Sequence, residues 1–201
     1  MVEPYPDPHP NRLHEMSFCD DIELSTAIES SEAIDLSTND GELRRLIFDP
    51  SIESRQKILA ASLLSRRGIA DPESRLFGVI VEVSLKEGLD VLAVYEDGTA
   101  RYINYSGKIV IWETVTSKSR ELSSALFSAV RQVDKQIRPW DGERLPPPVV
   151  GNARLSFLVG PAIYFGEGPF EVLAVDPMGG AVIERASEFM AFLVERVTQS
   201  P

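Results

Sequence analysis

The sequence has very few of the side chains that most often perform catalysis or bind transition metals. Its 201 residues include one cysteine, Cys19, and two histidines, His9 and His14. All three lie in a proline-rich N-terminal stretch, where we expect no rigid scaffold to hold a nucleophile beside its base. The remaining sequence then offers no Ser-His or Cys-His pair and no histidine or cysteine ligand for zinc or iron. We therefore expect no resident metal or cofactor.

Short motifs with a known mechanism are also missing. No CxxC, HExxH, GxSxG or Walker A pattern occurs. Residues 166–168 read Gly-Glu-Gly, like the start of a dinucleotide-binding fingerprint, but Glu171 stands where the third glycine belongs. We interpret that stretch as a hairpin turn. The glycine pair at 179–180 could present backbone N–H groups to an anion, although close packing of a helix start explains it as well.

Basic clusters are scarce, and the acidic residues are unevenly distributed. The chain has 31 acidic and 20 basic residues and a net charge of -11. Residues 1–42 contain eleven of the acidic residues and a single base, Arg12, so the rest of the chain is nearly neutral. Phosphate backbones are bound by clustered Lys and Arg, and anionic lipid surfaces repel acidic segments. We therefore predict no nucleic-acid partner and no membrane partner.

Long apolar runs are absent as well. No stretch approaches the ~20 apolar residues that a membrane-spanning helix needs. The first residues have neither the basic start nor the apolar stretch of a signal peptide, and one cysteine cannot form an internal disulfide. The expected location is the cytoplasm.

Hydrophobic patterning divides the chain into two parts. Residues 1–38 are rich in Pro, Ser, Asp and Glu and have few large apolar side chains, which predicts a disordered acidic leader. Residues 39–201 are predicted to form a single domain. If so, deletion of the leader should change the stability of the domain by less than about 1 kcal/mol.

The order of patterns in residues 39–201 predicts an α+β fold. Asp49 and Pro50 favour the start of a helix that ends at Gly68. Four β-rich segments follow at intervals typical of an antiparallel meander, at residues 76–85, 89–95, 99–105 and 109–112. The Asp97-Gly98 pair indicates the tight turn between the second and the third of them.

The second half adds two helices and more strands. Apolar residues at steps of three and four predict a helix over residues 117–137, and Asp176 begins the last helix. Between them we expect two or three short strands, at residues 155–159, 162–165 and 170–175. The predicted architecture is an antiparallel sheet, a four-strand meander followed by two or three short strands, packed with about three helices.

Two sets of residues on the predicted sheet are candidate sites. The first set is the carboxylates on or beside strands, any two of which could meet across the sheet and perform acid–base catalysis. They are Glu82, Glu96, Asp97, Glu113 and Glu171. The common alternative is a solvated sheet face. Tyr102 and Tyr105 fall on opposite faces of the meander, either as core and cross-strand contacts or as part of a partner-binding surface.

The stretch 138–152 is the third candidate, because loops of this length without periodicity tend to be functional or disordered. It places Trp140 between Arg138 and Arg144, the residue types that dominate protein interfaces, and Pro146 begins a run of three prolines that stiffens the chain. The alternative is that Trp140 pins the loop to its own domain.

These observations favour a non-enzymatic protein-interaction or regulatory domain, acting on a protein partner or on itself as a homodimer. The alternative is a small-molecule-binding domain, or a histidine-free hydrolase that uses carboxylates. An enclosed pocket with convergent polar groups would support the alternative, and a flat apolar surface would support the first hypothesis.

Overall fold

The computed structural model describes residues 3–21, 34, 36–69, 75–133 and 136–199, which form an α+β fold around one antiparallel sheet. Its six strands have the order β4-β3-β2-β1-β5-β6. Their bounds are β1 Leu76–Leu85, β2 Gly88–Tyr95, β3 Ala100–Ile103, β4 Ile109–Trp112, β5 Asn152–Val159 and β6 Ala162–Pro169.

The first four strands confirm the predicted meander, since each pairs with the next along the chain. β5 then pairs with the free edge of β1, which makes β1 a central strand and explains its nearly continuous apolar run. In the turn between β2 and β3 only Gly98 has a positive φ, of 89°, and the Gly98 N–H donates to the carbonyl of Tyr95.

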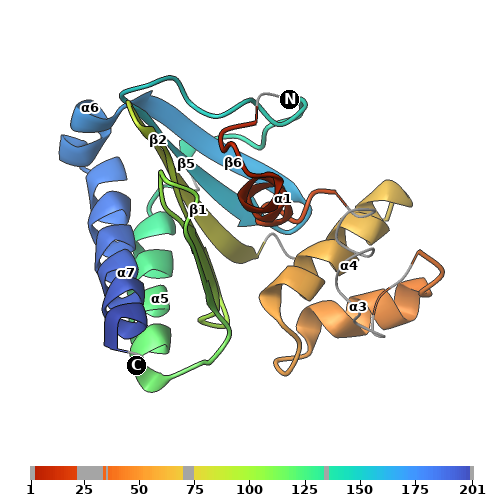
Figure 1. The fold of residues 1–201 in the computed structure, drawn as a ribbon. Helices are drawn as coiled ribbons and strands as arrows, with labels where there is room; N and C mark the ends of the chain where they lie inside the picture. Colours follow the sequence, from red (N-terminus) through yellow and green to blue (C-terminus); the bar gives the residue numbers. More distant parts are fainter. Residues whose placement is uncertain (1–2, 22–33, 35, 70–74, 134–135, 200–201) are drawn as a thin grey trace.

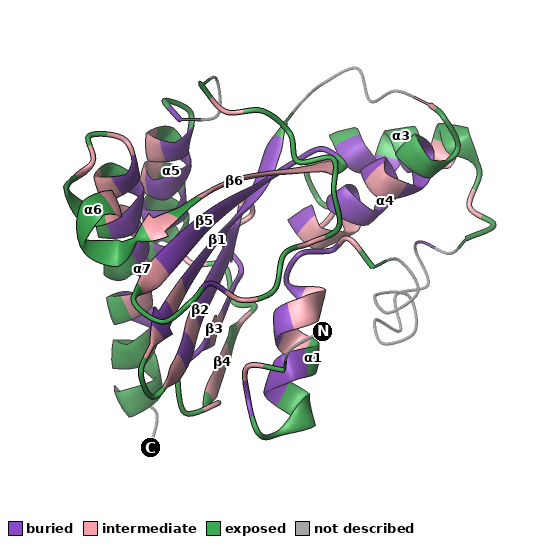
Figure 2. Cartoon of the chain, turned by 90° about the horizontal axis from the view of Figure 1, so that it is seen from above, coloured by how far each residue is buried: buried purple, intermediate pink, exposed green. Residues whose placement is uncertain are grey.

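Helices cover both faces of the sheet. The described helices are α1 Pro8–Met16, α3 Asp40–Phe48, α4 Ser54–Arg66, α5 Ser117–Val130, α6 Phe170–Val175 and α7 Gly179–Gln199. α5 and α7 lie side by side on one face, and α1, α3 and α4 lie on the other (Figure 1). Two apolar cores result, and burial is concentrated in the central strands and on the inward sides of the helices (Figure 2). None of these helices is long and apolar enough to cross a membrane.

The first predicted helix begins later than expected, and a further helix, α3, precedes it. Asp49 ends α3 as its C-cap residue and accepts hydrogen bonds from the backbone and the hydroxyl of Ser51, so its carboxylate organises the turn that follows. The prediction of a helix start at Asp49 and Pro50 was therefore wrong, and α4 begins only at Ser54. The predicted end is confirmed: Gly68 has a φ of 74° and the next N–H returns to the carbonyl of Leu64.

Residues 170–175 form α6 and are not a strand. β6 continues to Pro169, and the Phe170 N–H then donates to the carbonyl of Gly151, so the chain turns away from the sheet. A six-residue apolar run is too short for periodicity to distinguish strand from helix, which is why the sequence misled here. The predicted helix over 117–137 is also shorter and ends at Val130.

The N-terminal segment packs on the sheet, so the prediction of a disordered leader over residues 1–38 was wrong for residues 3–21. Tyr5 and Phe18 are each 2% exposed, and the Tyr5 hydroxyl donates to the carbonyl of Leu89 on β2. Asp7 accepts a hydrogen bond from the backbone of His9 and caps α1, with Pro8 at its first position. Residues 22–33 and 35 of the predicted leader lie outside the described residues.

Candidate functional site

A groove of about 630 Å³ lies between α4 and α5, at the turn that joins β2 to β3. The two helices belong to the layers on opposite faces of the sheet, so the groove is formed where these layers meet beyond the strand ends. Its walls come from four separate segments of the chain and include Ser54, Lys57, Arg75, Asp97, Thr99, Ser124 and Phe127.

Asp97, in the turn between β2 and β3, is hydrogen-bonded to the start of α4. Its carboxylate accepts from the Ser54 N–H at 2.7 Å and from the Thr99 hydroxyl at 2.7 Å, while the Ser54 hydroxyl accepts from the Asp97 N–H at 3.1 Å. Burial by itself would raise the pKa of Asp97, but the hydrogen bonds from Ser54 and Thr99 outweigh it and lower the pKa. Asp97 therefore stays ionised and holds the start of α4 against the turn.

The other carboxylates of the groove have cationic partners. The three ion pairs are Glu53 with Arg55 at 2.9 Å, Glu96 with Arg75 at 2.6 Å, and Glu113 with Arg101 at 3.0 Å. Three of the carboxylates that the sequence suggested as catalytic candidates, Glu96, Asp97 and Glu113, thus line one groove, each engaged by hydroxyl, backbone or guanidinium groups.

Three cations of the groove have no such partner. Lys57, Arg120 and Arg131 line it, and no hydrogen bond or ion pair joins their side chains to another described residue. Arg120 on α5 and Arg131 at its C-cap are exposed, whereas Lys57 is only 5% exposed. The lining itself has four acidic and four basic residues, and cations exceed carboxylates only when Arg55 and Arg101, which pair with Glu53 and Glu113 from outside the lining, are counted.

Lys57 is the residue of this site that sequence reasoning missed. Burial and, after it, the charge of Arg75 lower the pKa of Lys57, although nearby carboxylates oppose the shift. A signal was present: Lys57 falls in the apolar phase of α4, with Ala60, Ala61 and Leu64 following at steps of three, four and seven. A lysine in an apolar stripe is rarely buried without a reason.

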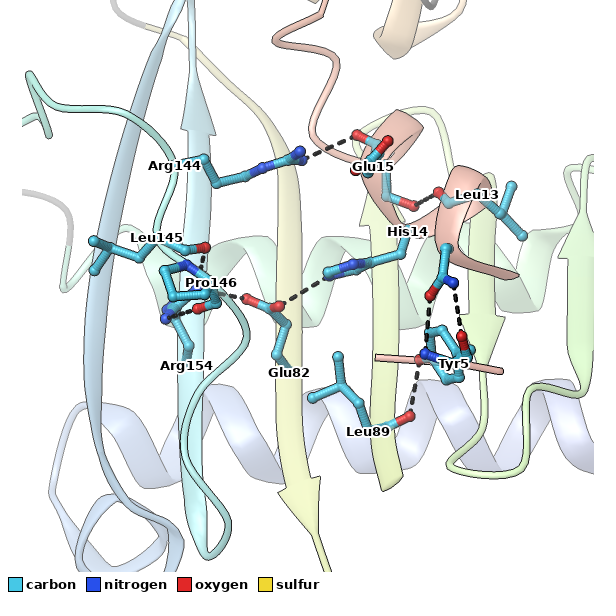
Figure 3. A network of polar contacts seen from close by, with 12 residues as sticks. Tyr5, Leu13, His14, Glu15, Glu82, Leu89, Arg144, Leu145, Pro146 and Arg154 are labelled. Atoms are coloured by element: carbon cyan, nitrogen blue, oxygen red, sulfur yellow. Dashed lines mark hydrogen bonds and ion pairs between the residues drawn. The ribbon is translucent and has the colours of Figure 1, made fainter. Parts of the chain in front are cut away.

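A second polar cluster lies on the sheet face beneath α1, centred on Glu82 of β1, which is 1% exposed. His14 Nε2 lies 2.9 Å from Glu82 Oε1, and Arg154 Nη1 lies 3.5 Å from Glu82 Oε2. Arg154 also binds Glu167 on β6 at 2.7 Å. Figure 3 shows His14 descending from α1 and Arg154 approaching from the adjacent strand, so that both converge on the Glu82 carboxylate.

The segment 138–152 covers this cluster. Arg154 donates to the backbone carbonyls of Leu145 at 3.3 Å and Pro146 at 2.7 Å, and Arg144 donates to the carbonyl of Glu15 at the end of α1 (Figure 3). The cluster ties α1, the central strands and the loop together. His14 is thus part of the ordered domain, contrary to the prediction, and the Asp7-Pro8 cap was the sequence signal for it.

Trp140 is held to its own domain by hydrogen bonds, yet it is also partly exposed. Its backbone N–H donates to the carbonyl of Ile163 on β6, and its indole N–H donates to the carbonyl of Glu143 at 2.9 Å. The ring packs edge to face on Phe165, yet the residue is 40% exposed. Trp140 and Arg144 line the same pocket of about 190 Å³.

The other sequence-selected residues lie apart from this pocket. Arg138 is exposed on the loop. Tyr105 is 46% exposed in the turn after β3. Tyr102 faces α7, where it lines a small apolar pocket beside Asp90, and burial together with the Asp90 charge raises its pKa to about 12. Of the remaining carboxylate candidates, Glu171 is exposed on α6.

Within the described residues, no group of three or more His, Cys, Asp and Glu side chains is placed to hold a metal ion. Comparisons of the chain with known protein families, curated proteins and solved structures gave no match. Its function therefore has to be argued from the geometry of these sites.

Proposed function

We propose that this chain is a binding domain that holds a small molecule in the groove between α4 and α5. The observation that carries the proposal is Lys57, which is only 5% exposed and lines the groove without a hydrogen bond or ion pair to another described residue. Burial lowers the pKa of its ammonium, so a polar group that supplies a hydrogen-bond acceptor would be bound favourably.

The shape of the groove supports the same proposal. Its volume of about 630 Å³ falls within the range of small-molecule sites. Ser54 and Thr99 are already locked by Asp97, so this part of the wall is formed before a ligand arrives. A preformed wall lowers the entropy cost of binding. Of the hypotheses drawn from the sequence, the small-molecule-binding alternative is the one that this arrangement favours.

Filling the groove tests the proposal. Ser124 is exposed on α5 and lines the groove, so Ser124→Trp should occupy it without disturbing the core. We expect at least one compound of a metabolite library to raise the melting temperature of the wild-type protein by several degrees and to leave Ser124→Trp unchanged.

Glu121→Trp is the matched control, because Glu121 is exposed on the same helix and does not line the groove. It should respond to the ligand as the wild type does. If no compound stabilises the wild type, or if Ser124→Trp responds equally, the groove is not a ligand site.

A protein-interaction domain is the second candidate function, and the exposure of Trp140 is the observation that favours it. Exposed tryptophan beside arginine is the composition of interface hot spots, and Trp140 shares a pocket with Arg144. A second copy of the chain is the simplest partner to test, because it needs no other component.

For Trp140→Ala we expect association to weaken by about 2 kcal/mol or more, as at a hot spot. Folding stability should fall by only about 1–2 kcal/mol, less than the 3–5 kcal/mol for a fully buried tryptophan, because the residue is 40% exposed. Sedimentation equilibrium across concentrations measures the first quantity, and urea unfolding measures the second. A large stability loss with unchanged sedimentation would assign Trp140 to packing alone.

A further inference from the structure

We infer that the groove between α4 and α5 binds an organic polyphosphate, a molecule with at least two phosphate groups, and that Lys57 is its central contact. This inference rests on the proposed function of the groove and specifies the chemistry of its ligand.

The charges of the groove point to an anion. All four carboxylates that line it are engaged: three are ion-paired with arginines, and Asp97 accepts hydrogen bonds from Ser54 and Thr99. Three cations, Lys57, Arg120 and Arg131, have no hydrogen bond or ion pair to another described residue, although the charges of Glu96 and Asp97 act on Lys57 from a greater distance. Counted with the arginines that pair with its carboxylates, the groove has six cations and four carboxylates, and an anionic ligand would neutralise the difference.

The burial of Lys57 is the independent observation. Lys57 is 5% exposed and lines the groove, and its ammonium reaches the groove without a hydrogen bond or ion pair to another described residue. An ammonium group in this position is disfavoured in the empty protein, as the downward shift of its pKa by burial also indicates. An anion in the groove would supply the hydrogen-bond acceptor and the opposite charge together.

The arrangement on α5 points to more than one anionic group. Arg120, Ser124, Phe127 and Arg131 follow one another at steps of four, three and four, so they share one face of the helix. At 1.5 Å per residue, the backbone positions of the two arginines are separated by roughly 16 Å along the helix axis, so a cation stands near each end of this stripe. Lys57 lines the same groove from α4.

The neutral groups of the groove suit an organic phosphate. The hydroxyl of Ser124 has no hydrogen-bond partner among the described residues and can donate to a phosphate oxygen. Phe127, which is 5% exposed, provides an apolar wall for the organic part. Three cations without an ion pair offer more donors than a single carboxylate can use, whereas each phosphate carries about -1.5 to -2 at pH 7 and three acceptor oxygens.

The test uses the whole 201-residue chain and pyrophosphate as the probe. We expect isothermal titration calorimetry to show pyrophosphate binding to the wild type, at least tenfold weaker binding to Lys57→Met, and a smaller, several-fold weakening for Arg120→Gln. Lys86→Met is the matched control, because Lys86 is an exposed lysine in the turn between β1 and β2 and should leave the affinity unchanged. Citrate at equal ionic strength is titrated for comparison, to test whether the groove prefers phosphate to carboxylate groups.

The fold of Lys57→Met provides a second readout. Because the methionine side chain has a similar length and no charge, this variant should melt at the same temperature as the empty wild type or higher. Loss of pyrophosphate binding together with a clear loss of stability would show a structural role for Lys57 and overturn the inference. Wild-type protein that does not bind pyrophosphate, Lys57→Met that binds equally well, or citrate that binds more tightly would also overturn it.

These outcomes separate the inference from the proposed function. If an uncharged library compound binds the wild type but not Ser124→Trp, while pyrophosphate does not bind, the groove is a ligand site and the polyphosphate inference is wrong. If neither pyrophosphate nor any library compound binds, both fail together.

Discussion

Replacing Arg154 with methionine should lower the free energy of unfolding by about 3–5 kcal/mol, as breaking a buried ion pair on one side usually does. The guanidinium lies between Glu82 and Glu167 and donates to two loop carbonyls, and it is 4% exposed. Its removal leaves Glu82, which is 1% exposed, with His14 as its only ionisable partner among the described residues.

Guanidinium chloride unfolding of the wild type and of two variants measures this effect. Arg75→Met is the control, because Arg75 also pairs with a glutamate, Glu96, but its side chain is 42% exposed. That pair should contribute less than about 1 kcal/mol. The double variant Arg154→Met/Glu82→Gln should recover part of the loss, since it removes the stranded charge. A loss below about 1 kcal/mol for Arg154→Met would mean that the cluster does not hold this face of the fold together.

Deletion of residues 1–21 should destabilise the domain by at least about 4 kcal/mol and lower its melting temperature by about 10 °C or more. The segment buries Tyr5 and Phe18 against the sheet and supplies His14 to Glu82. Full burial of one aromatic side chain contributes about 1.5–3 kcal/mol, and the stranded Glu82 carboxylate adds to the loss. This expectation reverses the one drawn from composition, which was a change below about 1 kcal/mol.

Thermal unfolding followed by circular dichroism tests the deletion. Arg12→Ala is the matched control, because Arg12 lies on the exposed side of α1 and should change the melting temperature by only a degree or two. A truncated protein that melts within a few degrees of the full chain would restore the interpretation of residues 3–21 as a dispensable leader.

Local patterns were sufficient for the four-strand meander. β1 and β4 have the predicted bounds, and β2 begins one residue earlier than predicted, because runs of β-branched residues between turn signals depend on neighbours close in the chain. The glycines at 68 and 98 adopt the positive φ that their turns require. The antiparallel meander and the α+β class follow from these local signals, since short turns leave few other ways to pair consecutive strands.

Local patterns were insufficient for the N-terminal segment. Its prolines and acidic residues have the composition of a disordered chain, yet Pro8 begins a helix and Asp7 caps it. The partner of His14 is Glu82, 68 residues away, and Tyr5 binds a carbonyl 84 residues away. Contacts of such separation have no periodicity in the sequence, so composition by itself gave the wrong answer.

The sequence by itself determined the four-strand meander, the turns at Gly68 and Gly98 and the general balance of charge, but it predicted a strand where α6 lies. The tertiary structure decided which charged residues lack a partner. Whether Lys57, Glu82 or Arg154 is paired depends on groups brought from other elements when the helices fold onto the sheet. Burial then turns an ordinary surface residue into a costly isolated charge or a buried ion pair, because the energy of a charge depends on the solvent and partners around it and not on its position in the chain.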